Sequence, residues 1–82
     1  MVDKAKAYIT DITNPYILND VDADTATKYY GYSRPDGSWY IQRETESGGD
    51  QLYRYVKGSV DYATAWTSRA SLSYDYGHEI FA

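Results

Sequence analysis

The stretch that decides the fold is residues 28–44, KYYGYSRPDGSWYIQRE. Two runs rich in tyrosine, tryptophan and isoleucine, which favour extended structure, flank the segment Pro35-Asp36-Gly37. This segment favours a tight turn, because proline presets φ, aspartate can accept a hydrogen bond from the backbone ahead of it, and glycine tolerates a left-handed conformation. The stretch therefore predicts two antiparallel strands joined by a short loop.

A three-residue loop fixes the register of this predicted pair. Tyr32 then faces Tyr40, and Gly31 faces Ile41. Because glycine has no side chain, the second pair leaves room for a neighbouring ring above it.

A third extended segment, residues 51–57, follows a turn over residues 46–50 that contains Gly48-Gly49. The glycine pair permits more than one loop length, so the register of this strand stays open. Residues 28–57 predict a three-stranded antiparallel meander, and the alternatives for the complete sheet are an open meander, a sandwich or a barrel.

The flanking segments are less regular. Residues 60–70, VDYATAWTSRA, have helical spacing, with Ser59 or Asp61 as candidate N-cap, and they predict one short helix. Residues 71–74 alternate polar and apolar side chains and predict a final short strand. Residues 1–18 predict an extended N-terminal arm, with short strands at residues 8–10 and 16–18, and residues 19–27 predict a loop. We expect a single, mainly β domain over residues 1–82.

Aromatic residues dominate the composition. Eleven of the 82 residues are tyrosine, with two tryptophans, one phenylalanine and no cysteine. A domain of this size buries only about 60% of its unfolded surface, so several rings are expected at the surface. Without disulfides or thiolate-bound metals to brace it, the chain is expected to gain stability from assembly with other chains. The candidate interface residues are Tyr8, Tyr16, Tyr29, Tyr40, Tyr53 and Tyr55, and the candidate core residues are Trp39, Ile41, Val56, Trp66, Arg69 and Leu72.

Charge and hydropathy exclude several classes of function. The net charge of −4 argues against sequence-independent nucleic-acid binding, which needs a basic face. The sequence contains no run of about 20 apolar residues, so it predicts no membrane span. No apolar stretch follows the lysines of residues 1–10, so it predicts no export signal. We expect no cofactor, and we expect synthesis in the cytoplasm.

Two polar clusters are candidate sites. Residues 20–24, DVDAD, alternate three aspartates, but an EF-hand needs glycine at the sixth position and glutamate at the twelfth, where this chain has Thr25 and Gly31. A solvated acidic loop is the preferred interpretation. Tyr76 with His78-Glu79 lacks a partnered nucleophile and a glycine-rich phosphate loop, so the chain is predicted not to be an enzyme.

The aromatic surface allows two further interpretations. Tyrosines 40, 53 and 55 with Arg43 and Arg54 could stack on single-stranded nucleic acid, and Trp39 or Trp66 could stack on a sugar ring. Cross-strand packing within the sheet, worth up to about 1 kcal/mol per pair, explains the same residues without a ligand.

Three segments carry a resemblance: Tyr29-Tyr30-Gly31-Tyr32, Trp39-Tyr40-Ile41-Gln42-Arg43, and the ending Trp66-Thr67-Ser68-Arg69-Ala70-Ser71-Leu72-Ser73-Tyr74. The chain here resembles small uncharacterised virion proteins of tailed bacteriophages that share a Trp-x-x-Arg-x-Ser-Leu-x-Tyr ending. The resemblance spans residues 28–74 and implies a component of a phage particle, located in the virion. It assigns no site residues.

The sequence therefore favours a non-enzymatic structural protein, most simply a multi-copy capsid decoration or auxiliary protein, or else a protein of the tail or neck. Its expected partners are other virion proteins and copies of itself, with no membrane. The alternative is a carbohydrate-binding module that recognises a host surface.

Overall fold

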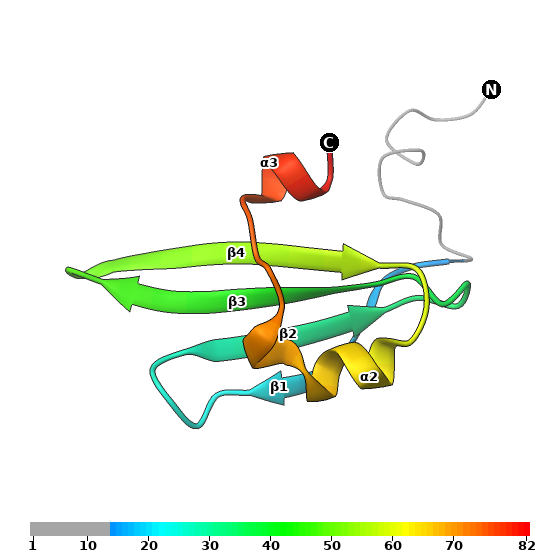
Figure 1. Cartoon of the computed structure of the whole chain (residues 1–82), viewed down its shortest axis with the longest axis horizontal. Coiled ribbons are helices and arrows are strands. Elements are labelled where there is room, and N and C mark those ends of the chain that lie inside the picture. Colours follow the sequence, from blue (N-terminus) through cyan, green and yellow to red (C-terminus); the bar gives the residue numbers. More distant parts are fainter. Residues whose placement is uncertain (1–13) are drawn as a thin grey trace.

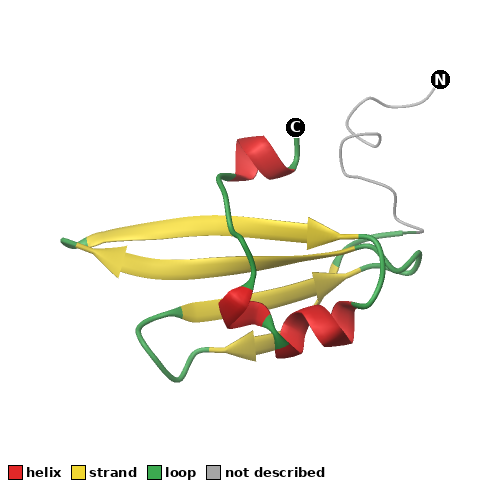
Figure 2. Cartoon of the chain, in the orientation of Figure 1, coloured by secondary structure: helices red, strands yellow, loops and turns green. Residues whose placement is uncertain are grey.

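A computed structural model describes residues 14–82, and its centre is one antiparallel sheet. The strands lie side by side in chain order (Figure 1): β1 Ile17–Asp22, β2 Lys28–Ser33, β3 Trp39–Ser47 and β4 Asp50–Gly58. Three short helical segments follow: α2 Tyr62–Thr67, the 3₁₀ helix η1 Arg69–Ser71, and α3 Gly77–Ile80. The predicted mainly β antiparallel meander is confirmed, with a fourth strand and more helical turns than predicted (Figure 2).

The hairpin of β2 and β3 has the predicted register. Tyr32 pairs with Tyr40 and Gly31 pairs with Ile41. In the turn, the Asp36 carboxylate accepts a hydrogen bond from the backbone N–H of Ser38 at 2.8 Å, and Gly37 has a φ of 94°. Hydrogen bonds from Ser38 and from the Asn14 side chain lower the pKa of Asp36 to about 2. The turn is thus held by the side chain that the sequence singled out.

β1 is longer than predicted. Residues 19–22 were expected to be a loop, yet they continue the strand to Asp22 and pair with β2 after an irregularity between Leu18 and Asp20. Their polar side chains do not suggest a strand. Distant residues hold them: the Tyr62 hydroxyl donates a hydrogen bond to Asp20 at 2.7 Å, and Arg69 binds Asp22.

β3 and β4 form a long hairpin that extends beyond the rest of the sheet. The last pair of β2 with β3 is Lys28 with Glu44, whereas β3 and β4 stay paired to Ser47 and Asp50. Gly48 and Gly49 join them with φ values of 59° and 91°, the left-handed turn that glycine makes at no steric cost. The register of β4 against β3, which the sequence left open, is therefore set by a two-residue turn.

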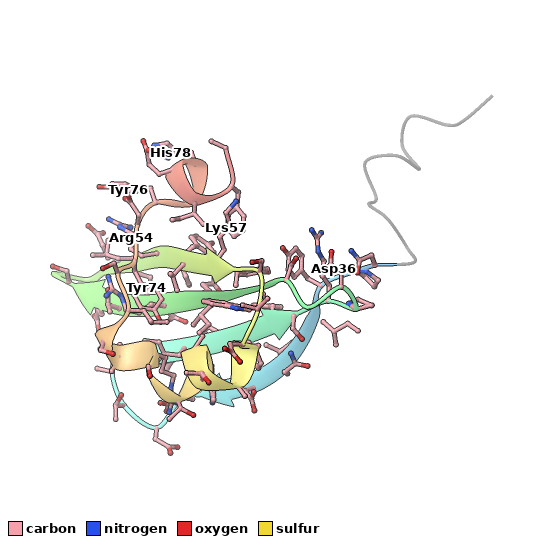
Figure 3. All side chains as sticks on the ribbon, turned by 45° about the vertical axis from the view of Figure 1, so that its right-hand side comes forward. Asp36, Arg54, Lys57, Tyr74, Tyr76 and His78 are labelled. Carbon is pink, nitrogen blue, oxygen red and sulfur yellow. The ribbon has the colours of Figure 1, made fainter. Side chains whose placement is uncertain are left out.

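The prediction of a final strand at residues 71–74 is wrong, because none of these residues pairs with the sheet. Leu72 and Tyr74 pack against the core, and the only strand-like contact of this segment is a single bridge between Asp75 and Tyr55 of β4. The chain then crosses the edge of β4 and forms α3. Figure 3 shows Tyr74, Tyr76 and His78 following this path, with Arg54 beside them.

The core lies between the sheet and α2. Trp39, Ile41 and Ala65 are buried, and Ile41 is fully so. Six partly buried side chains pack around them: Tyr29, Val56, Tyr62, Trp66, Leu72 and Tyr74. α2 begins after Asp61, which has a φ of 61° and makes no side-chain cap, so neither predicted N-cap residue caps the helix through its side chain.

Candidate functional site

The two faces of the sheet differ in what covers them. Cross-strand neighbours share a face, so Gly31, Ile41 and Val56 lie together under α2, and we call this the helix face. The opposite face carries the tyrosines of three strands, and we call it the tyrosine face: Tyr30, Tyr32, Tyr40, Tyr53 and Tyr55. The first face builds the fold, and the second is covered only in part.

Arg69 connects α2 to β1 across the helix face. Its guanidinium donates to Oδ2 of Asp22 at 2.9 and 3.2 Å, and it lies 4.4 Å from the centre of the Trp66 ring. The Tyr74 hydroxyl donates to the carbonyl of Arg69 at 2.9 Å. The hydrogen bond from Arg69, foremost among several causes, lowers the pKa of Asp22. The ending Trp66–Tyr74 is therefore a clamp between the C-terminal segment and β1.

A row of rings crosses the tyrosine face. Tyr32 and Tyr40 stack with their centres 4.5 Å apart and their planes 15° apart. Tyr16 meets Tyr40 edge-on at 4.9 Å, and Phe81, which follows α3, meets it at 5.2 Å. Burial, followed by the neighbouring phenols, raises the pKa of Tyr40 to about 12. The end of the row at β4 is thus covered by the chain's own C-terminal turn.

Polar groups between these rings are paired with one another. The Tyr30 hydroxyl donates to Glu44 at 2.8 Å, and this bond raises the pKa of Tyr30. The Gln51 amide donates to the other oxygen of Glu44 at 2.6 Å, and the Gln42 amide donates to the Tyr55 hydroxyl at 3.0 Å. Because these side chains already bond to one another, few of the polar groups described in the middle of this face are left to bind a polar ligand.

An apolar rim lies at the other edge of the sheet. We call Tyr16, Ile17, Leu18 and Val21 the β1 rim, and the last three are 55%, 48% and 52% exposed. β1 pairs with β2 on one side only, so the backbone groups on its outer side have no strand partner among the described residues. An edge strand with half-exposed aliphatic side chains is suited to contact with another chain.

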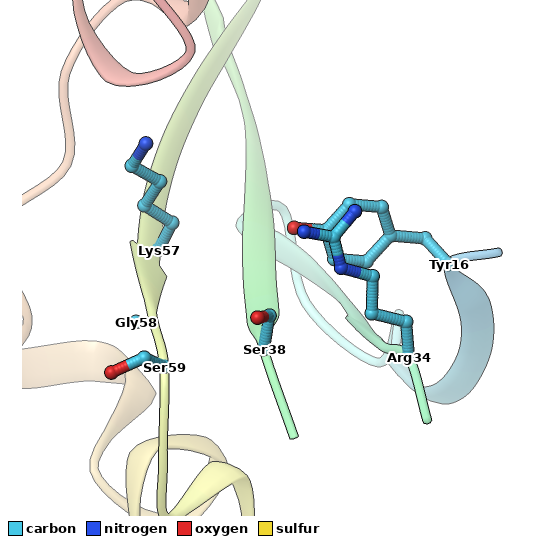
Figure 4. A pocket seen from close by; sticks show the side chains of 6 residues that line it. All are labelled: Tyr16, Arg34, Ser38, Lys57, Gly58 and Ser59. Carbon is cyan, nitrogen blue, oxygen red and sulfur yellow. The ribbon is translucent and has the colours of Figure 1, made fainter. Parts of the chain in front are cut away.

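A pocket of about 370 Å³ opens at one end of the sheet, beside the β1 rim. Figure 4 shows Arg34 and Lys57 on either side of Ser38, with the Arg34 guanidinium over the Tyr16 ring at 4.5 Å. We call it the cationic pocket, and it is lined by Tyr16, Arg34, Ser38, Lys57, Gly58 and Ser59.

The candidate interface residues are divided between the two faces. Tyr40, Tyr53 and Tyr55 lie on the tyrosine face, and Tyr16 lies in the β1 rim. Tyr29 does not join them: it lies on the helix face, 6.0 Å from Tyr74, because it is one residue out of phase with Tyr30. Tyr8 lies outside the described residues.

The candidate core residues all lie on or against the helix face. Trp39 and Ile41 are buried, Val56, Trp66 and Leu72 pack on them, and Arg69 stacks on Trp66. Both tryptophans thus belong to the fold, and the Trp39 indole N–H donates to the carbonyl of Val60 at 2.7 Å.

Sequence reasoning missed the β1 rim and the cationic pocket. The sequence predicts a short strand at residues 16–18, but the place of this strand at a sheet edge depends on a pairing that the hydrophobic pattern does not reveal. Arg34 and Lys57 are 23 positions apart, and only the closure of the meander brings them together.

Other features add no chemistry to these surfaces. Within residues 14–82, no three histidine, cysteine, aspartate or glutamate side chains gather as a metal site would require, and the three aspartates of residues 20–24 are no exception. None of the helices in that range is long and apolar enough to cross a membrane.

Comparison with known proteins gives no relative. No family model, curated protein or solved structure matches the chain.

Proposed function

We propose that this protein is a non-enzymatic structural component of a tailed-phage particle, as a multi-copy capsid decoration or auxiliary protein. A place at the tail or neck is the second position within the same class. The observation that carries the proposal is the β1 rim, where Ile17, Leu18 and Val21 stay about half exposed on an edge strand.

The β1 rim has the properties of an assembly surface. Each 100 Å² of apolar surface removed from water there would contribute about 2.5 kcal/mol. Within residues 14–82 only three core residues are buried, so the fold has much to gain from such a contact. The strand carries no lysine or proline to discourage pairing at its edge, and its two aspartates, Asp20 and Asp22, are held by Tyr62 and Arg69.

The phage context rests on the resemblance of residues 28–74. The shared ending contributes Trp66, Arg69, Leu72 and Tyr74, which clamp the helix face in this chain. Proteins with the same ending are therefore expected to share this packing, and a multi-copy role would follow from the surfaces that the packing leaves open.

The carbohydrate-binding alternative has less support. The two tryptophans that could stack on sugar rings pack in the core, and two hydroxyls of the tyrosine face, those of Tyr30 and Tyr55, are engaged with a carboxylate and a side-chain amide. Sugar binding is kept as an outcome of the experiment below.

Sedimentation tests the proposal. The purified protein is centrifuged alone and after mixing with phage particles that lack it, and we expect it to self-associate or to travel with the particles. The variant Ile17→Lys/Leu18→Lys, which places two charges in the β1 rim, should lose this behaviour.

Ala63→Lys is the matched control, because Ala63 is exposed on α2 and belongs neither to the rim nor to the residues that line the pocket. It should behave as the wild type. A wild-type protein that stays monomeric, ignores particles and binds a host glycan would overturn the proposal.

A further inference from the structure

The two ends of the sheet differ in shape and in charge. One end holds the cationic pocket, between the β2–β3 turn and the end of β4. At the opposite end the β3–β4 hairpin extends beyond the other strands (Figure 1), and we call its residues 45–52 the finger. One copy cannot bring its own finger to its own pocket, because the strands separate them.

The cationic pocket carries two positive charges, and among the described residues only one of them, that of Arg34, has a carboxylate partner. Lys57 forms no ion pair among residues 14–82. Arg34 has one carboxylate nearby, Asp36 at 3.5 Å from its Nε, but that Nε is shielded from solvent without a hydrogen bond. The Asp36 carboxylate is itself occupied by Ser38 and Asn14. Two cations with hydroxyl groups beside them, in a chain of net charge −4, suit a carboxylate ligand.

The finger carries such carboxylates. Glu46 and Asp50 are exposed near its tip, and neither forms an ion pair within the described part of the chain. Between them lie Ser47 and the pair Gly48-Gly49, around which there is open space. The tip is therefore slender as well as acidic.

We propose that the finger of one copy inserts into the cationic pocket of the next, so that Glu46 and Asp50 meet Lys57 and Arg34. This inference rests on the proposed function, whose partner it identifies as a second copy of the chain. The two contact surfaces differ, so the contact is head-to-tail. Repeating the contact gives a closed ring if the rotation between neighbouring copies closes, and an open filament if it does not. Both suit a multi-copy component.

Charge reversal tests the contact. In sedimentation velocity at low salt, Lys57→Glu and Glu46→Lys/Asp50→Lys should each weaken self-association about tenfold or more, as close charge pairs at interfaces do. An equimolar mixture of the two variants should associate again, because the new carboxylate at position 57 can then pair with the lysines of the altered finger, while the unaltered pocket of the second variant meets the unaltered finger of the first. Added salt should weaken the wild-type contact.

Glu79→Lys serves as the control, since Glu79 is exposed on α3 and belongs neither to the residues that line the pocket nor to the finger. It should associate as the wild type does. Circular dichroism must show that each variant is folded, and a variant that is not is replaced by Lys57→Gln or Glu46→Gln/Asp50→Asn.

The outcomes separate the two proposals. A wild type that associates or binds particles, with no change in either charge variant, overturns the finger-and-pocket contact and leaves the assembly role standing. If both variants self-associate more weakly and their mixture does not recover, the finger-and-pocket contact is also overturned, because nonspecific charge effects then explain the loss. A wild type that neither associates nor binds particles removes the assembly role itself.

Discussion

The indole of Trp66 on α2 lies directly over Gly31 of β2. A β-carbon added to Gly31 would come within 2.8 Å of Cε3 and 2.9 Å of Cζ3 of that ring, and it would also collide with the Tyr62 hydroxyl. The bare glycine lets the helix approach the sheet closely, and Ile41, its partner across β3, is fully buried beside it. This contact fixes the distance between the two layers of the fold.

Gly31→Ala should therefore destabilise the protein. The added methyl group must displace Trp66 and Tyr62, and overpacking of this kind costs about 1–3 kcal/mol. Gly77→Ala is the control, because its β-carbon would come no closer than 3.2 Å to the Tyr55 ring. Urea unfolding of both variants measures the difference. Equal stability of Gly31→Ala and wild type would contradict the close approach.

Trp66→Ala should unfold the protein or weaken it severely. The ring covers Gly31, stacks with Tyr62 at 6.3 Å and supports Arg69, so its removal leaves a cavity that the short helix cannot fill. Truncations of large aromatic core residues cost about 3–5 kcal/mol. Thermal melting beside the exposed Val60→Ala control measures the loss, and a value below about 1 kcal/mol would rule out a core role.

The sequence predicted those features whose signals are local. Pro35-Asp36-Gly37 set the turn and hence the register of β2 and β3. From that register the sequence also predicted the space above Gly31 that the Trp66 ring fills. Residues 62 and 66, four positions apart, indicated the face of α2 that meets the sheet.

The sequence did not predict features that depend on distant partners. Asn19 to Asp22 form a strand because Tyr62 and Arg69, more than 40 positions away, hold the two aspartates. Leu72 and Tyr74 alternate like a strand, but their side chains pack on the helix face instead. The cationic pocket was missed for the same reason, because its two cations line one pocket only once the sheet has formed.

Acid should weaken the clamp between Arg69 and Asp22. The Arg69 hydrogen bond lowers the pKa of Asp22 in the folded state below the usual value of about 3.9. The stabilisation is thus present above pH 4 and is lost as the pH falls through the folded pKa. Asp22→Asn should lower stability at neutral pH and flatten its decline in acid.

The charge-matched control for the clamp is Asp50→Asn, at the exposed tip of the β3–β4 hairpin. Asp36, whose pKa is about 2, adds its own acid dependence, so the decline persists in part in Asp22→Asn. Urea midpoints measured from pH 7 to pH 2 give the comparison. An Asp22→Asn profile parallel to that of the wild type would show that the pair contributes nothing.

Alkali should act on the tyrosine face through Tyr40. Its ring lies among Tyr16, Tyr32 and Phe81, and burial raises its pKa to about 12, whereas in the unfolded chain it ionises near 10. A raised folded pKa means that the stabilisation is complete below pH 10 and is lost as the pH rises through 12. Tyr40→Phe should remove this part of the alkaline decline. Tyrosinate absorbance should show one late-titrating group fewer in the folded variant, while protein unfolded in urea titrates near 10 throughout. Superimposable titrations of the folded variant and wild type would place Tyr40 in solvent and contradict the packed row of rings.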